Sequence, residues 1–95
     1  MKTYKIVEIL HSGRKGQRYS PVTNPKYEYM VNSLIRLDFD FVKQYEPINW
    51  FFLNHPIYKY WNTSALLALS RDEDEFWYLE TVNTIYVLKE VDYGN

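Results

Sequence analysis

The stretch from Trp61 to Val91 decides the fold, and it reads WNTSALLALS (61–70), RDEDE (71–75), FWYLET (76–81), VNT (82–84) and IYVLKEV (85–91). Three runs of apolar, aromatic and β-branched residues are separated by an acidic turn and by a short polar turn. Short runs divided in this way are typical of consecutive antiparallel strands. The sequence therefore predicts a three-strand antiparallel meander over residues 61–91.

Two further strands are predicted upstream of the meander. Residues 2–10 are rich in β-branched side chains and follow no helix N-cap, which favours a strand over a helix. Residues 27–39 alternate between apolar and polar side chains over much of their length, as a strand with one buried face does. The segment between them, residues 11–26, holds two Gly and two Pro and is predicted to be a long polar loop.

The middle of the chain has the least regular pattern. Asp40 is placed to cap one helical turn over residues 41–45, which Pro47 would end. Residues 49–60 are strongly aromatic and are expected to form a short strand or loop that leads into the meander. Ninety-five residues suit one hydrophobic core, so a single domain over residues 1–95 is expected.

The order of these elements resembles that of an SH3-like barrel over most of the chain. The opening motif and the ligand-binding signature of eukaryotic SH3 domains are missing, so the resemblance implies a fold and no ligand. We expect an all-β domain: a small, strongly bent antiparallel sheet or SH3-like barrel of five to six strands, with at most one short helical turn. The positions predicted to face its core are Ile6, Val31, Ile35, Leu37, Leu67, Leu69, Leu79, Ile85 and Val87.

Composition excludes several classes of chemistry. The chain has no cysteine, which rules out disulfides and thiolate chemistry. No run approaches the ~18 apolar residues of a membrane span, so a cytoplasmic protein without membrane association is expected. Neither histidine has a second ligand at metal-binding spacing, and Asp72–Glu75 lacks the pattern of a calcium loop. Neither a metal nor another cofactor is predicted, and with no nucleophile elbow the protein is not expected to be an enzyme.

Charge is distributed unevenly along the chain. Residues 1–36 carry seven Lys or Arg against two Glu, whereas residues 37–95 carry four against ten acidic residues. Three of the cations, Arg14, Lys15 and Arg18, lie in the long loop around Gly13 and Gly16. The Gly-x-x-Gly spacing lacks the flanking helices of a KH domain and the ending of a P-loop. This loop could hold an acidic partner or a phosphate by charge-assisted hydrogen bonds, or it could be solvated loop only.

Aromatic residues supply the strongest sign of recognition. A domain this small cannot fully bury eighteen rings, and six of them fall within residues 50–61. Trp50, Tyr58 and Tyr60 are the predicted contact residues in this cluster, because interface energy concentrates in Trp and Tyr. In the alternative reading the cluster fills the core, which suits Phe51, Phe52 and Trp61 better than the two tyrosines.

These features predict a small non-catalytic binding protein that masks or recruits a partner protein. Compact, cysteine-free, Tyr-rich chains of this kind resemble accessory or inhibitor proteins of phages and mobile elements. The predicted partner-binding residues are Tyr58, Tyr60, Trp50, Arg14, Lys15 and Arg18. The alternative is a nucleic-acid-binding or nucleotide-binding small barrel, in which the basic 14–18 loop holds phosphate and the aromatic cluster stacks on bases. The sequence pI of about 6.1 argues against that alternative.

Overall fold

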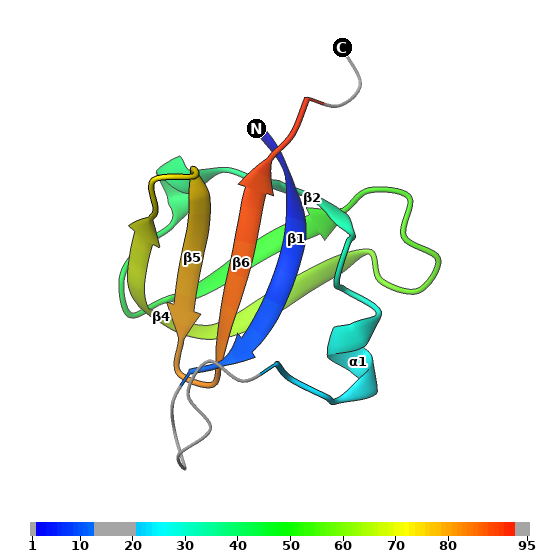
Figure 1. Ribbon diagram of the computed structural model, residues 1–95, viewed down its shortest axis with the longest axis horizontal. Helices are drawn as coiled ribbons and strands as arrows, with labels where there is room; N and C mark the ends of the chain where they lie inside the picture. The colour runs from blue at the N-terminus through cyan, green and yellow to red at the C-terminus, as the bar shows by residue number, and fades with distance from the viewer. Residues whose placement is uncertain (1, 13–20, 93–95) are drawn as a thin grey trace.

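A computed structural model describes residues 2–12 and 21–92, and it shows one antiparallel sheet closed into a barrel (Figure 1). The six strands are β1 (Lys2–His11), β2 (Leu34–Leu37), β3 (Pro47–Phe52), β4 (Tyr60–Arg71), β5 (Phe76–Thr81) and β6 (Thr84–Glu90). Each strand pairs with the next, and β6 pairs with β1, so the sheet has no free edge. The prediction of an all-β antiparallel barrel is confirmed.

Two short helical segments interrupt the strands, and both differ from prediction. Residues 27–39 are not one strand, because α1 (Pro25–Glu28) and a turn precede β2. The Asn24 side chain accepts a hydrogen bond from the Lys26 N–H and Pro25 opens the helix, a favoured start. The predicted turn at 41–45 is instead η2, a 3₁₀ turn at Phe39–Phe41 capped by Asp38. Neither described segment has the length or apolar character that crossing a bilayer would require.

The C-terminal meander forms as predicted, as β4, β5 and β6. The β4–β5 turn is fixed by the Asp72 carboxylate, which accepts hydrogen bonds from the N–H of Asp74 (3.0 Å) and Phe76 (2.9 Å). It also accepts one from the Tyr78 hydroxyl at 2.8 Å. The hydrogen bonds from Phe76 and Tyr78 hold the pKa of Asp72 below its usual value, because they stabilise the charged carboxylate. The acidic run 72–75 is therefore a hairpin turn.

The core is dominated by large side chains outside the set of positions predicted to face it. Trp50 lies at its centre, 1% exposed, with its ring edge-on to Tyr86 at 5.0 Å between centroids. Ile6, Ile35, Leu37 and Leu79 are buried as predicted, and Val31 is half-buried against the core. The buried core residues missing from the prediction are Tyr4, Ile9, Met30, Ile48, Trp50, Phe52, Leu66, Tyr86 and Leu88.

The predicted burial of Leu67 and Leu69 is wrong, although Leu69, as the register partner of buried Leu79, lies on the inner face of the sheet. Leu66 is 3% exposed, whereas Leu67 and Leu69 are 37% and 40% exposed. The register between β4 and β5 shifts between Leu66 and Ala68, so Leu67 has no partner on β5. An extra residue at such a bulge breaks the in–out alternation that the prediction assumed.

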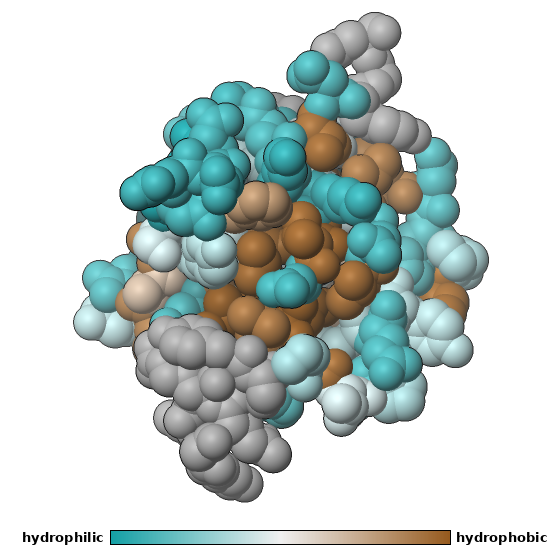
Figure 2. Space-filling model, viewed as in Figure 1, coloured by the Kyte–Doolittle hydropathy of each residue, from teal (hydrophilic) through white to brown (hydrophobic). Residues whose placement is uncertain are grey.

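Ile85 and Val87 are buried as predicted, but the side chains that β6 contributes to the core are Tyr86 and Leu88. Ile85 pairs with Leu10 of β1, and Val87 pairs with Glu8, on the opposite face of the sheet. An apolar area covers part of this outer face, over β1 and β6 (Figure 2). The predicted alternation of β6 was therefore one residue out of phase.

The corrected faces predict different effects for two leucine-sized truncations. Ile35→Ala removes a side chain that is fully buried and should lower the free energy of unfolding by about 2–5 kcal/mol. Leu67→Ala, at an exposed bulge, should cost less than ~1 kcal/mol. Urea denaturation of both variants measures the difference. Equal midpoints would contradict the assignment of faces.

Candidate functional site

An exposed aromatic pair lies on the outer face of β3 and β4. Along β3 the even-numbered positions are buried and the odd-numbered positions are exposed, as expected for one strand of a closed sheet. Phe51 is exposed in this pattern, and its register partner on β4 is Tyr60. Their side chains are 58% and 62% exposed. Directly opposed residues of adjacent strands share one face, so the two exposed rings lie side by side on the outer face of the sheet.

Cationic and amide side chains extend the patch. Arg36 of β2 is the partner of Phe51 on its other side, so Arg36, Phe51 and Tyr60 form a row across three strands. Asn49 and Asn62 are partners in the neighbouring row, and both are exposed. Lys59, which precedes Tyr60, is also exposed. This part of the barrel therefore presents two rings beside positive charge and amide groups.

The loop that joins β3 to β4 is organised by His55. Its Nδ1 accepts hydrogen bonds from the backbone N–H of Ile57 (3.0 Å) and of Tyr58 (2.9 Å). Because Nδ1 is an acceptor, the ring proton lies on Nε2, which donates to the Tyr29 carbonyl at 2.6 Å. One side chain thus fixes the loop to itself and to the turn after α1. Ile57, 56% exposed, is held at the tip of this loop.

A series of half-buried rings packs against the loop. The ring centroids of His55 and Tyr58 are 5.2 Å apart, and those of Tyr58 and Trp61 are 5.5 Å apart. The Tyr58 hydroxyl donates to the Lys26 carbonyl at 3.2 Å, which ties the loop to α1. Trp61 donates its indole N–H to the Tyr86 hydroxyl at 3.2 Å. Burial raises the pKa of the Tyr86 phenol, so this hydroxyl stays protonated and can accept.

We call Phe51, Ile57 and Tyr60, with Arg36, the hairpin surface. Strand pairing and His55 fix the backbone that carries these side chains, so the backbone of the hairpin surface is ordered before any partner arrives. Within residues 2–12 and 21–92, no three His, Asp or Glu side chains gather to hold a metal ion. The chemistry that the hairpin surface offers is apolar contact, hydrogen bonding and positive charge.

The structure separates the predicted site residues into three groups. Tyr60 belongs to the hairpin surface, and Tyr58 supports it from behind as a half-buried ring. Trp50 is wrong as a contact residue, because its ring is buried on the inner face of β3. Arg14, Lys15 and Arg18 lie outside the described residues.

The sequence analysis missed Phe51, Ile57 and Arg36. Phe51 was assigned to the core alternative together with Phe52, yet adjacent residues of a strand face opposite sides. The spacing of Ile48, Trp50 and Phe52 is the signal that could have placed Phe51 outside. Ile57 and Arg36 carried no such signal, because their positions depend on the loop and on the pairing of β2 with β3.

Replacing His55 should loosen the hairpin loop while leaving the barrel intact. In His55→Ala the N–H groups of Ile57 and Tyr58 lose their acceptor, so their hydrogen exchange should accelerate about tenfold or more. Lys59→Ala, an exposed substitution in the same hairpin, should leave the exchange rates of both amides unchanged. Exchange followed by NMR tests this, and unaltered rates in His55→Ala would show that other contacts fix the loop.

The site is therefore defined by geometry: a strand hairpin with two outward rings beside Arg36. A comparison of the chain with known protein families, with curated proteins and with solved structures finds no match.

Proposed function

We propose that this protein is a non-catalytic binding module that masks another protein by docking its hairpin surface on it. The observation that carries the proposal is the pairing of Phe51 with Tyr60, two rings more than half exposed on adjacent strands. Each aromatic side chain can remove roughly 150–250 Å² from water when it is covered. Such rings, next to an arginine, have the composition of an interface hot spot.

Preorganisation supports this role. A partner that docks on a loop must offset the entropy of ordering it, whereas the loop here is already tied down by His55 and Tyr58. Contact of Phe51, Ile57 and Tyr60 with the partner therefore contributes to affinity with little ordering cost. The hairpin surface acts as a rigid apolar anchor.

Charge indicates the kind of surface that fits. Arg36 adjoins the rings, and it takes part in no ion pair with another described residue. A partner with an apolar depression bordered by Asp or Glu complements this arrangement, because opposite charges steer association and fix register. The proposed partner is an acidic protein surface of that kind.

Removing the aromatic pair should abolish partner binding without unfolding the barrel. Phe51→Ser/Tyr60→Ser removes two exposed rings and should weaken affinity by about 10²-fold or more, since interface aromatic anchors typically contribute 2 kcal/mol or more each. A matched control is Phe41→Ser/Tyr45→Ser, which removes another Phe and Tyr that are even more exposed (81% and 71%). The Tyr45 backbone bonds to Leu66, further along β4 than Tyr60, so the control pair lies elsewhere.

The measurement is affinity capture from the native host with wild type and both double variants as baits, analysed by mass spectrometry. A captured protein that is lost with Phe51→Ser/Tyr60→Ser alone is then purified, and its Kd is measured by calorimetry. Retention of the partner by that variant, or its loss with the control pair, would refute the hairpin surface as the docking site.

The row of Arg36, Phe51 and Tyr60 also favours a second candidate function, single-stranded nucleic-acid binding. Two rings on adjacent strands can stack on successive bases while a cation meets phosphate. A mixed-sequence oligonucleotide of about twelve nucleotides, DNA or RNA, is a suitable probe. Under this alternative it binds, and its log affinity falls linearly with log salt concentration. Under the protein-masking proposal, fluorescence anisotropy should detect no binding at physiological salt.

A further inference from the structure

The open end of the barrel carries a second candidate site, which is concave and separate from the hairpin surface. A cavity of about 760 Å³ lies where β1 begins and β2 and β6 end, a volume in the range of small-ligand sites. We call it the mouth cavity. Its residues come from five of the six strands and from η2, so its shape depends on closure of the barrel.

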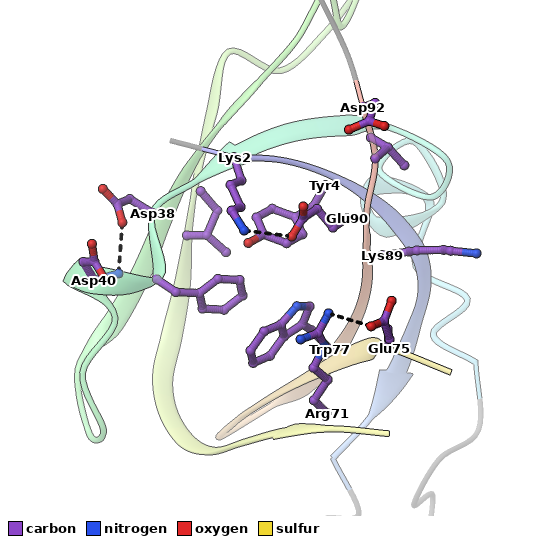
Figure 3. A pocket seen from close by; sticks show the side chains of 13 residues that line it. Lys2, Tyr4, Asp38, Asp40, Arg71, Glu75, Trp77, Lys89, Glu90 and Asp92 are labelled. Atoms are coloured by element: carbon purple, nitrogen blue, oxygen red, sulfur yellow. Dashed lines mark hydrogen bonds and ion pairs between the residues drawn. The ribbon is translucent and has the colours of Figure 1, made fainter. Parts of the chain in front are cut away.

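One wall of the mouth cavity is aromatic. Phe39 of η2 stacks on Trp77 of β5 at 4.5 Å between centroids and meets Tyr4 of β1 edge-on at 5.2 Å. Trp77 lies across the cavity from the Lys2–Glu90 ion pair (Figure 3). The Trp77 indole N–H is covered from solvent and has no hydrogen-bond partner among the described residues. This wall is thus largely shielded from water, and the Trp77 indole N–H in it lacks a hydrogen-bond partner among the described residues.

The rim of the mouth cavity has excess negative charge. Five carboxylates line it against three cationic side chains, and two of those cations are already paired. Lys2 lies 3.3 Å from Glu90, and Arg71 lies 3.7 Å from Glu75. Lys89, the third, points away from the cavity (Figure 3) and lies 5.3 Å from the Phe76 ring centroid.

Three rim carboxylates therefore remain without a cation among the described residues: Asp38, Asp40 and Asp92. Asp38 accepts a hydrogen bond from the Asp40 N–H at 3.0 Å, and this bond keeps both residues at the η2 side of the rim. Burial is the main cause that raises the pKa of the Tyr4 phenol, and the charge of Glu90 raises it further, so this wall of the cavity is desolvated. A cation that entered would meet these unpaired carboxylates at the rim, beside an aromatic wall.

We propose that the mouth cavity binds an organic cation, an ammonium or guanidinium group carried on an apolar or planar body. Arg71 shows the chemistry within the molecule: its guanidinium carbon lies 4.9 Å from the Trp77 ring centroid while its nitrogen pairs with Glu75. No three of the described carboxylates converge closely enough to chelate a metal ion. The inference does not rest on the function proposed for the hairpin surface.

A cation of this class has two possible sources, a free polyamine or the basic side chain of a bound protein. The probes are therefore spermidine for the first source and Nα-acetyl-arginine amide for the second. Nα-acetyl-citrulline amide is the matched control, because it replaces the guanidinium by a neutral group of the same shape. Each is titrated into ¹⁵N-labelled protein, and the indole N–H signals are followed by NMR, with the Trp77 signal assigned from Trp77→Phe.

At least one of the two cations should shift the Trp77 indole signal in a saturable manner and leave the buried Trp50 signal unmoved. The neutral citrulline probe should bind roughly tenfold more weakly or worse, because it lacks the charge. Saturation by spermidine alone assigns a free polyamine, and saturation by the arginine probe alone assigns a partner's side chain.

Two variants of rim residues should change the affinity for the cation in opposite directions, and a third variant is the control. Asp38→Asn/Asp40→Asn keeps an acceptor for the Asp40 N–H but removes two charges, and should weaken binding roughly tenfold. Glu28→Gln/Glu46→Gln removes equal charge from exposed positions elsewhere and should leave affinity nearly unchanged. Lys2→Gln frees Glu90 from its internal cation and should tighten binding.

The proposal is overturned if neither cation shifts Trp77 at millimolar concentration, or if the citrulline probe binds as tightly as the arginine probe. Equal loss of affinity in the two carboxylate double variants would also overturn it, because attraction to the net charge of the protein would then explain the binding. Loss of partner capture by Phe51→Ser/Tyr60→Ser has no bearing on these outcomes, so the two sites can fail independently.

Discussion

The register of β3 against β4 is the constraint on which both the core and the hairpin surface depend. It places Trp50 inside, against Tyr86 and Phe52, and at the same time places Phe51 outside, opposite Tyr60. A slip of one residue would exchange the two faces, exposing Trp50 and burying Phe51. Because Trp50 fills the centre of the barrel, that slip would be costly. The packing of one indole therefore fixes the position of the exposed rings.

The presence of the strands could be predicted from the sequence more readily than which face of each strand is buried. The meander over 61–91 was recognised because its turns are polar and its runs are rich in β-branched and aromatic residues. Leu67 was misassigned because a bulge between Leu66 and Ala68 leaves no mark in the sequence. The faces of β6 were misassigned because the strand is buried from Thr84 to Leu88, so its pattern does not show which side faces the core. The strand expected at 27–39 was too long at its N-terminal end, because Asn24 and Pro25, just before it, start a helix that continues to Glu28. Local capping chemistry outweighed periodicity there.

The sequence predicted that the candidate site would contain surface aromatic residues, but it predicted only part of their positions. An excess of rings over the capacity of a small core pointed to surface aromatics, and Tyr60 is one of them. Which ring of the Trp50-Phe51-Phe52 run faces outward depends on parity, and aromatic propensity carries no information about parity. The mouth cavity could not be found from sequence at all, because Tyr4, Phe39 and Trp77 are brought together by closure of the barrel. Its charged rim likewise joins residues from the two ends of the described chain, as Lys2 and Glu90 show.

Closure through β1 and β6 also has a consequence for biosynthesis. β1 is made first among the strands and can pair with β2 early, but its second edge stays open until β6 has left the ribosome. During that interval the backbone of β1 presents unpaired N–H and C=O groups, a template for strand addition by any neighbouring chain. Residues 84–90 end that exposure when they pair with β1. Pairing with β6, the last strand of the barrel, therefore protects the second edge of β1 from other chains.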